Sequence, residues 1–143
     1  MKKIIFTVAL IGFVLVSCNK EKRAMKKLEG NWNITAYTID SAGISIDYWA
    51  QMQAIGVSSL TMNFENCGTE ATCNLYETTT SSAVGISDTD TSSYELSEDV
   101  TTITIIDDGS IDEYLIDELT STSLIVSTVY GNTTETITLE KVE

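Results

Sequence analysis

The feature that most constrains this fold is a succession of short segments, many of them alternating polar and apolar residues, that starts at Leu28. The segments are rich in threonine, isoleucine, valine and tyrosine, which favour β-strands, and the sequence contains no proline to interrupt a strand. Turn signals such as Asp108-Gly109 and Gly131-Asn132 separate some of them. The pattern predicts an all-β domain with strands near residues 31–40, 59–67, 73–80, 94–96, 100–107, 111–117, 124–130 and 133–142.

Eight predicted strands, joined mostly by short turns, are expected to pair with their sequence neighbours in an antiparallel, up-and-down order. Eight such strands can close into a β-barrel, which removes the exposed edges of an open sheet. In the second strand, Leu60, Met62 and Phe64 alternate with polar residues and are expected to face the interior. Residues 81–92, SSAVGISDTDTS, are predicted to form a loop.

One segment, residues 47–56, departs from the strand pattern. Its apolar side chains recur at helical spacing at Tyr48, Met52 and Ile55, with Trp49 beside them. Asp47 can cap the start of a helix and Gly56 can end it. We predict a short helix in the connection after the first strand, folded over the mouth of the barrel as a lid.

The first residues are not expected to belong to the barrel. Lys2 and Lys3 precede an apolar run at residues 4–16, which is too short for a comfortable membrane span, and Cys18 follows soon after it. This order predicts a secretory signal peptide over residues 1–17. Two interpretations of Cys18 are open. It is either a site of lipid attachment, or an incidental cysteine that follows an ordinary cleaved signal peptide.

Residues 15–18, LVSC, resemble the lipobox of bacterial lipoproteins. The resemblance implies that Cys18 becomes the first residue of the mature chain and carries several acyl chains, such as palmitate. Each buried methylene contributes about 0.8 kcal/mol, so several chains anchor a protein stably in a membrane. Because Asn19 stands where an aspartate often retains lipoproteins at the inner membrane, the resemblance implies a cell-envelope protein of the outer membrane that faces the periplasm.

Charge is distributed unevenly along the chain, whose net charge is −13. Residues 20–27, KEKRAMKK, are strongly basic, whereas Lys141 is the only basic residue after them. An acidic domain repels nucleic acid, so nucleic-acid binding by its surface is excluded. We divide the chain into the signal peptide, a basic tether (18–27) that either rests on anionic lipid headgroups or is solvated, and a barrel domain (28–143).

Two further cysteines, Cys67 and Cys73, lie in the segment CGTEATC. In an exported protein this spacing suits a disulfide that bridges two strands across a hairpin loop. The alternative, a metal-binding cysteine pair, lacks partners because the chain contains no histidine and no other cysteine beyond Cys18. We predict the disulfide and no metal site.

The motif GNW, Gly30 to Trp32, at the head of the first strand resembles the Gly-x-Trp signature of the lipocalins. The preceding KKLEG fits the short helical turn of that family, and the lipobox together with residues 114–128 resembles the lipocalin-like lipoproteins common in Bacteroidota. The resemblance implies a lipocalin-like barrel whose closed end is filled by Trp32, with Gly30 letting the chain pass tightly into the strand. Lipocalins often cover this tryptophan with an arginine from the last strand; here Lys141 could lie over it as a weaker cation–π partner.

Catalytic motifs are missing from the sequence. Without histidine there is no Ser-His-Asp or Cys-His arrangement, and no glycine-rich phosphate loop occurs. Paired carboxylates such as Asp107 and Asp108 are expected in turns, where solvation accounts for them. Residues 87–92 and 107–112 offer oxygen ligands but do not match an EF-hand loop. We therefore predict that the protein is not an enzyme and uses no cofactor.

The candidate ligand-binding residues are aromatic or contain sulfur, and they come from the lid and the barrel walls: Tyr48, Trp49, Met52, Met62, Phe64 and Tyr94. They either line an apolar cavity or fill it, since an eight-stranded barrel is just wide enough for either arrangement. The first case predicts a lipid-anchored protein that binds a small hydrophobic ligand. The second predicts a filled barrel that acts as a structural module or contacts another envelope protein.

Overall fold

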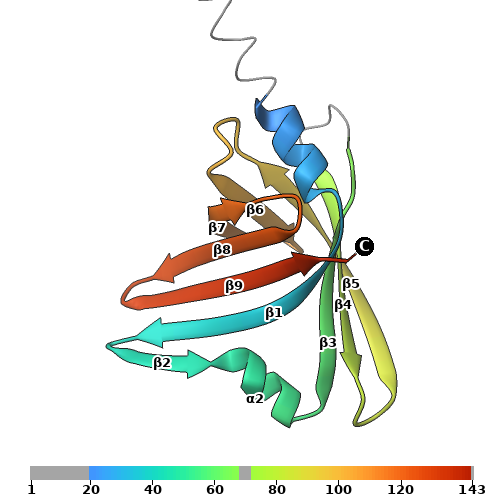
Figure 1. Ribbon diagram of the computed structural model, residues 1–143, viewed down its shortest axis with the longest axis vertical. Coiled ribbons are helices and arrows are strands. Elements are labelled where there is room, and N and C mark those ends of the chain that lie inside the picture. Colours follow the sequence, from blue (N-terminus) through green and yellow to red (C-terminus); the bar gives the residue numbers. More distant parts are fainter. Residues whose placement is uncertain (1–19, 68–71, 143) are drawn as a thin grey trace, which may run out of the picture.

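The computed structural model describes residues 20–67 and 72–142, so the predicted signal peptide and the predicted lipidation site Cys18 lie outside the described residues. A helix over residues 20–28 precedes the sheet (Figure 1). The elements that follow are β1 (Gly30–Ser41), β2 (Ile44–Asp47), α2 (Tyr48–Ala54), β3 (Val57–Phe64), β4 (Cys73–Ser81), β5 (Ile86–Leu96), β6 (Thr102–Asp107), β7 (Ser110–Leu119), β8 (Ser123–Tyr130) and β9 (Thr133–Lys141).

The nine strands of the described chain form one antiparallel sheet in the order β2-β1-β3-β4-β5-β6-β7-β8-β9. A further pairing between β1 and β9, from Trp32 opposite Lys141 to Ser41 opposite Thr133, closes this sheet on itself. β2 pairs only with the last residues of β1 and lies outside the closed ring. The remaining eight strands make the barrel, so the predicted closed, eight-stranded antiparallel barrel is confirmed.

The prediction of a loop at residues 81–92 was wrong, because most of this segment belongs to β5. This strand extends over Ile86–Leu96 and pairs with β4 along its length, whereas only a short strand near Tyr94 was expected. Its first residues are all exposed, so no apolar alternation marks them in the sequence. Cross-strand contacts stabilise the pairing instead, as between the Thr78 and Thr89 hydroxyl oxygens, which lie 2.9 Å apart.

The predicted helix after the first strand is present as α2. Its N-cap is Asp47, whose Oδ1 accepts a hydrogen bond from the backbone N–H of Ala50 at 2.8 Å. Gly56 follows the helix with a positive φ of 101°. The four residues of β2, which the sequence did not predict, form a hairpin with β1 just before the helix, and none of their side chains is buried.

The closed end of the barrel is built around Trp32. Its side chain is fully buried, and its Nε1 donates a hydrogen bond to the carbonyl oxygen of Leu28 at 2.6 Å. Two residues earlier, Gly30 has a φ of 113°, a conformation that side-chain-bearing residues rarely adopt, and so lets the chain turn sharply into β1. The Nζ of Lys141 lies 5.1 Å from the centroid of the tryptophan ring, within cation–π range, and donates to the carbonyl oxygen of Lys27 at 2.7 Å.

Residues 20–28, most of which the sequence assigned to a basic tether, form a helix that lies on this closed end (Figure 1). Ala24 and Leu28, one turn apart, are both buried. The basic side chains of the helix therefore occupy the outer face of a packed element.

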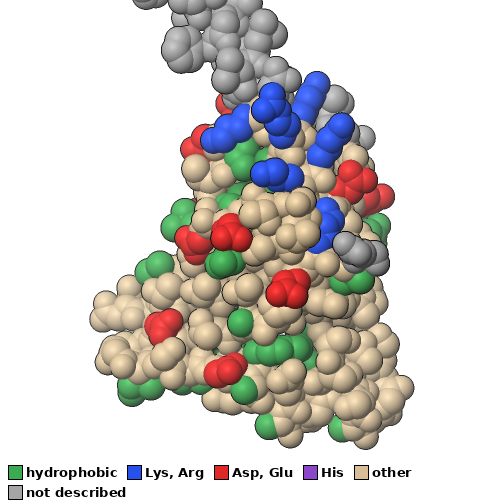
Figure 2. Space-filling model, in the orientation of Figure 1, with side chains coloured by type: hydrophobic (Ala, Val, Ile, Leu, Met, Phe, Trp, Pro, Cys, Tyr) green, Lys and Arg blue, Asp and Glu red, His purple; other side chains and the backbone are tan. Residues whose placement is uncertain are grey.

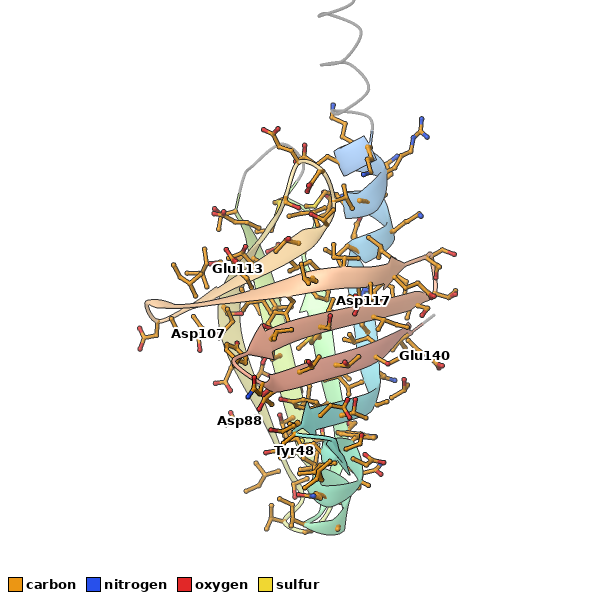
Figure 3. All side chains as sticks on the ribbon, turned by 90° about the vertical axis from the view of Figure 1, so that its left-hand side faces the viewer. Tyr48, Asp88, Asp107, Glu113, Asp117 and Glu140 are labelled. Carbon is orange, nitrogen blue, oxygen red and sulfur yellow. A yellow bond between two sulfur atoms is a disulfide. The ribbon has the colours of Figure 1, made fainter. Side chains whose placement is uncertain are left out.

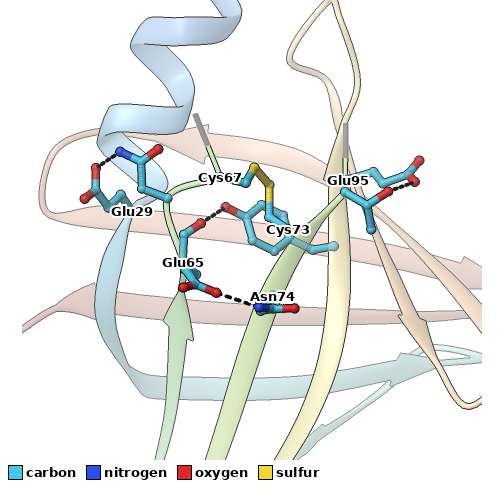
Figure 4. The surroundings of a disulfide bond; sticks show 9 residues. Glu29, Glu65, Cys67, Cys73, Asn74 and Glu95 are labelled. Atoms are coloured by element: carbon cyan, nitrogen blue, oxygen red, sulfur yellow. Dashed lines mark hydrogen bonds between the residues drawn. A yellow bond between two sulfur atoms is a disulfide. The ribbon is translucent and has the colours of Figure 1, made fainter. Parts of the chain in front are cut away.

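The predicted disulfide is confirmed between Cys67 and Cys73, whose Cα atoms lie 5.2 Å apart (Figure 4). It joins the chain just after β3 to the first residue of β4. Beside it, the hydroxyl of Tyr94 donates to the carbonyl oxygen of Glu65 at 2.9 Å, and Asn74 Nδ2 donates to Glu65 Oε2 at 2.6 Å. The disulfide thus lies in a polar network that links the ends of β3, β4 and β5.

Replacing both bridging residues, Cys67→Ser with Cys73→Ser, is expected to lower the free energy of unfolding by about 2 kcal/mol, because a short covalent loop no longer restricts the unfolded chain. Urea denaturation followed by circular dichroism measures this change. The parent protein treated with a reductant should show the same loss. An unchanged urea midpoint in both samples would contradict a stabilising role for the disulfide.

Candidate functional site

The interior of the barrel near Trp32 is almost completely filled. It contains an apolar cavity of about 20 Å³. The lining residues are Met62, Phe64, Ile103, Ile105, Tyr114, Leu124, Val126, Ile137 and Leu139. A space of this size holds about one water molecule. This cavity alone is too small for a large ligand.

A larger pocket, of about 190 Å³, lies next to this cavity and has a different chemistry. Its lining residues are Glu77, Asp90, Ser92, Ile105, Asp107, Asp112 and Tyr114. Ile105 and Tyr114 border both spaces, so the apolar cavity and this acidic pocket are neighbours. We call the second space the acidic pocket.

The acidic pocket follows from a change of residue type along the inward faces of three strands. In β4, the fully buried Leu75 is followed two residues later by Glu77, and in β6 Ile105 is followed by Asp107. In β5, Asp90 and Ser92 precede the fully buried Tyr94 on the same face. Each strand is apolar toward the closed end and acidic away from it. Figure 3 shows Asp107 at the tip of the β6–β7 hairpin, away from the N-terminal helix.

The barrel wall opens beside this pocket. In the described chain β5 pairs with β6 only from Ser93 to Leu96, opposite residues 103–106. The stretch Ile86–Ser92 pairs with β4 on one side and with no described strand on the other. Asp90 and Ser92 from this part of β5, together with Asp107 at the end of β6, line the pocket, so the pocket lies beside the unpaired part of the strand.

Negative charges crowd one another inside the acidic pocket. Glu77 and Asp90 are direct cross-strand partners, a position in which like charges are destabilising. Burial raises the pKa of the Glu77 carboxyl, and the negative charges of Asp107 and Asp90 raise it further. Burial also raises the pKa of Tyr114 to about 12, with added contributions from Tyr130 and Asp112. The folded protein therefore pays a free-energy cost to keep Glu77 ionised.

Replacing Glu77 by glutamine is expected to increase the free energy of unfolding near pH 7, because the variant has no buried charge at this position. The pKa of Glu77 is raised in the folded state, so its carboxyl stabilises the fold fully at pH values below its unfolded pKa. This contribution is lost as the pH rises through the folded pKa. The gain from Glu77→Gln should therefore shrink as pH falls below about 4. Urea titrations near pH 7 and below about pH 4 measure this gain in the free energy of unfolding. A gain that increases as the pH falls would contradict a buried charge at Glu77.

Two of the six predicted ligand-binding residues, Met62 and Phe64, line the apolar cavity. Tyr94 is fully buried, packs edge-on against Phe64 with ring centroids 5.1 Å apart, and borders neither space. The predicted lid residues Tyr48, Trp49 and Met52 lie on α2 and border neither space. Tyr48 packs edge-on against Tyr37 at 4.9 Å, and Trp49 packs at the margin of the core.

The acidic pocket was not predicted from the sequence. Asp107 was predicted to be a solvated turn residue, Asp90 and Asp112 were weighed only as oxygen ligands within residues 87–92 and 107–112, and Glu77 was not singled out. The alternation within each strand was an available signal. Glu77 lies two residues from Leu75 and Asp112 lies two residues from Tyr114, so each carboxylate is on the same face of its strand as an apolar or aromatic side chain. What the sequence could not show is that four strands bring these carboxylates together.

The described residues contain no group of three or more histidine, cysteine, aspartate or glutamate side chains arranged to hold a metal ion. Among the same residues, no helix is both long and apolar enough to cross a membrane. Ser92 borders the acidic pocket, and its Oγ is buried without a hydrogen-bond partner in the described chain.

Comparison with solved structures identifies the same barrel in proteins of very different sequence. A lipocalin-like protein from Bacteroides uniformis superposes with a TM-score of 0.55 at 18% identity, covering 81% of this chain and 99% of the other. Japanin from Rhipicephalus appendiculatus, solved bound to cholesterol, gives 0.60 at 6% identity, covering 79% and 74%. The siderocalin Ex-FABP, described as having dual ligand specificities, gives 0.55 at 9% identity, covering 81% and 74%. At these identities the likeness concerns the fold.

The sequence matches none of the curated proteins at a significant level. A family model for the lipocalin-like domain matches residues 28–126, from the last residue of the N-terminal helix to the middle of β8. This match covers more than half of the chain and includes Gly30, Trp32 and most of the closed barrel, in agreement with the resemblance first seen in the motif GNW. The chain therefore belongs to the family of lipocalin-like domains.

Proposed function

We propose that this protein binds a small hydrophobic molecule in its barrel, with entry through the gap beside β5. The observation that carries the proposal is the acidic pocket of about 190 Å³ bordering the apolar cavity along Ile105 and Tyr114. Ligand pockets combine apolar walls with a few convergent polar groups, and these two spaces together supply both. The cholesterol bound to Japanin, which has the same fold, supports such a use of the barrel.

A ligand larger than the acidic pocket requires side chains to move. Met62 lines the apolar cavity, and its unbranched side chain changes conformation at little cost. A ligand that displaces it would enlarge the cavity toward Phe64. We therefore expect a small ligand seated near the mouth of the barrel, in contact with Ile105 and Tyr114.

Native mass spectrometry tests this proposal directly. The chain from Lys20 onward, which contains every described strand and the N-terminal helix, is purified from periplasm without detergent. A reproducible additional mass that disappears on denaturation is the expected result, and its identity names the ligand class. A bare mass two hydrogens below the reduced value, as the disulfide requires, would count against a carrier.

The proposed function is binding, with no catalytic step. Glu77 and Asp90 are direct cross-strand partners that both line the acidic pocket, and paired carboxylates can serve as acid and base in enzymes. Their pocket, however, is lined by no histidine or cysteine, and its serine hydroxyl is hydrogen-bonded to no carboxylate of the described chain. A bound ligand recovered chemically unchanged after prolonged incubation is the expected outcome, and its conversion would overturn this assignment.

We further propose that the protein is lipid-anchored at Cys18 in the outer membrane and faces the periplasm. The basic residues of the described chain all belong to the N-terminal helix or to the end of β9: Lys20, Lys22, Arg23, Lys26, Lys27 and Lys141. Figure 2 shows the Lys and Arg side chains gathered toward the end of the molecule that carries the N-terminal helix. Such a surface is attracted to anionic headgroups, which would hold the closed end against the membrane and leave the acidic pocket accessible.

Metabolic labelling with a palmitate analogue tests the anchor. Label is expected on the parent protein and not on Cys18→Ser, and the parent should fractionate with the outer membrane. Substitution of Cys67 and Cys73 should leave the label unchanged. Equal labelling of parent and Cys18→Ser would overturn lipidation at this residue.

A second candidate function rests on the outer surface. Ile111, Leu115, Val129 and Tyr130 are all at least half exposed and border a groove of about 450 Å³ on the β7–β8 wall. Exposed apolar patches of this kind often mark contacts with other proteins. Together with the nearly filled core, this patch supports a structural or interaction module of the envelope. Crosslinking in cells that is lost in Leu115→Glu, with ligand binding intact, would favour this candidate.

A further inference from the structure

The acidic pocket contains four carboxylates and no basic side chain. Glu77, Asp90, Asp107 and Asp112 come from four successive strands, β4 to β7, and converge on one space. Tyr130 donates a hydrogen bond to Asp112 at 3.1 Å, whereas Glu77 lies opposite a second carboxylate, Asp90, in the sheet. Nothing within the pocket compensates the negative charge.

The basic residues of the described chain lie at the other end of the barrel. Five of them are on the N-terminal helix. The sixth, Lys141, is held at the closed end by its contacts with the Trp32 ring and the Lys27 carbonyl oxygen. The charge of the acidic pocket is therefore not neutralised by a nearby lysine or arginine, and Glu135, which accepts a hydrogen bond from Tyr37 at 2.8 Å, adds another carboxylate on β9.

The hydrogen-bonding groups of the acidic pocket suit a ligand that donates hydrogen bonds. Carboxylates accept hydrogen bonds, and an ammonium group offers three donors. Ser92 provides an independent sign of a missing partner, because its Oγ is buried and bonds to no other group of the described chain. Buried polar atoms of this kind usually have a partner. An amine in this pocket would place donors within reach of Ser92 and of the carboxylates.

The neighbouring space suits an apolar group. Beyond Ile105 and Tyr114, the small cavity is bordered only by apolar side chains, among them Ile103 and Val126. A molecule with a short apolar body and a charged end could place each part in a matching environment. An anionic end would instead face carboxylates in a partly desolvated space, where repulsion is stronger than in water.

We infer that the barrel selects amphipathic cations, molecules with a short apolar body and a protonated amine, over neutral and anionic molecules of the same shape. This inference rests on the proposed function, because it names the ligand class for the same site. The amine lies among Glu77, Asp90, Asp107 and Asp112 and contacts Ser92. The apolar body lies against Ile105 and Tyr114 and extends toward the apolar cavity.

Three probes with the same tail and different ends test this selectivity: octylamine, octanol and octanoate. Isothermal titration calorimetry at low salt near pH 7, where the amine is protonated and the acid ionised, gives their dissociation constants with the chain from Lys20 onward. Octylamine is expected to bind at least about tenfold more tightly than octanoate, with octanol between them. Added salt should reduce the difference.

A pair of matched variants separates the pocket from the overall negative charge of the protein. Glu77→Gln with Asp90→Asn removes two pocket carboxylates, and Glu113→Gln with Glu140→Gln removes two exposed ones from β7 and β9. Figure 3 shows the last two on the barrel wall. The preference for octylamine should fall in the first variant and persist in the second. Circular dichroism establishes that both variants are folded.

The remaining outcomes distinguish a failure of the proposed selectivity from a failure of the proposed binding function. Equal affinity for the three probes, or tighter octanoate binding, would overturn the selectivity and leave the binding function standing. A preference reduced equally by both variants would overturn the assignment to the pocket. No binding of any probe, together with a bare mass in native mass spectrometry, would overturn the proposed function itself.

Discussion

Replacing Trp32 by alanine is expected to lower the free energy of unfolding by about 3–5 kcal/mol, the range for removing a large buried aromatic side chain. Trp32 is fully buried at the closed end and contributes to the same core cluster as Leu28 and Leu139. Its loss would leave a cavity beneath the N-terminal helix and an unbonded carbonyl oxygen at Leu28. Urea denaturation followed by far-ultraviolet circular dichroism measures the change.

Two variants control this experiment. Trp32→Phe keeps a ring in the closed end but lacks the donor to Leu28, so we expect a loss of about 2 kcal/mol. Trp49→Ala removes the other tryptophan, which is only partly buried on α2, and should cost clearly less than Trp32→Ala. Similar losses for both alanine variants would contradict the closing role of Trp32.

The second large effect is expected at Gly56, the residue that connects α2 to β3. Its φ of 101° disfavours any side chain, and a Cβ there would lie 2.4 Å from the Cβ of Ala83. Its carbonyl oxygen also accepts hydrogen bonds from the β4–β5 turn, including the backbone N–H of Ser82 at 3.0 Å. Gly56→Ala therefore combines backbone strain with a steric clash, and we expect it to cost about 3 kcal/mol.

Gly85→Ala is the matched control for Gly56→Ala. Gly85 lies in the adjoining turn and also has a positive φ, of 65°, but an added Cβ would meet no atom within 4 Å. This substitution should cost about 1 kcal/mol, because only the backbone conformation is unfavourable. Thermal unfolding of the two variants side by side compares them. A cost at Gly85 equal to that at Gly56 would show that the contact with Ala83 has no influence.

Much of the fold could be predicted from the sequence, because most strands bury one face. β3 alternates with Met62 and Phe64 buried, and β8 and β9 carry similarly clear apolar positions, so their limits were close to those observed. β5 was largely missed because the first half of the strand buries nothing and is specified by its partner β4. The Asp47 cap is a local signal, and α2 was accordingly predicted correctly.

The candidate site was harder to predict than the fold. Met62 and Phe64 could be found because alternation shows which side chains face inward, and both do line the cavity. Glu77 and Asp112 were missed because a carboxylate is normally assigned to the solvent, and only the closure of the barrel turns these two toward the same space. The proposed selectivity depends on side chains of four strands, a relation that no single segment of sequence contains.

The half of β5 that lacks a second strand partner has a consequence for self-association. An exposed strand edge presents free backbone N–H and C=O groups to which another chain can add, and this is a common route to aggregation. Ile86 at the start of this edge is exposed, but Asp88 and Asp90 follow it. Their charges repel a second acidic chain, so the same aspartate that lines the pocket also disfavours edge-to-edge pairing at this strand.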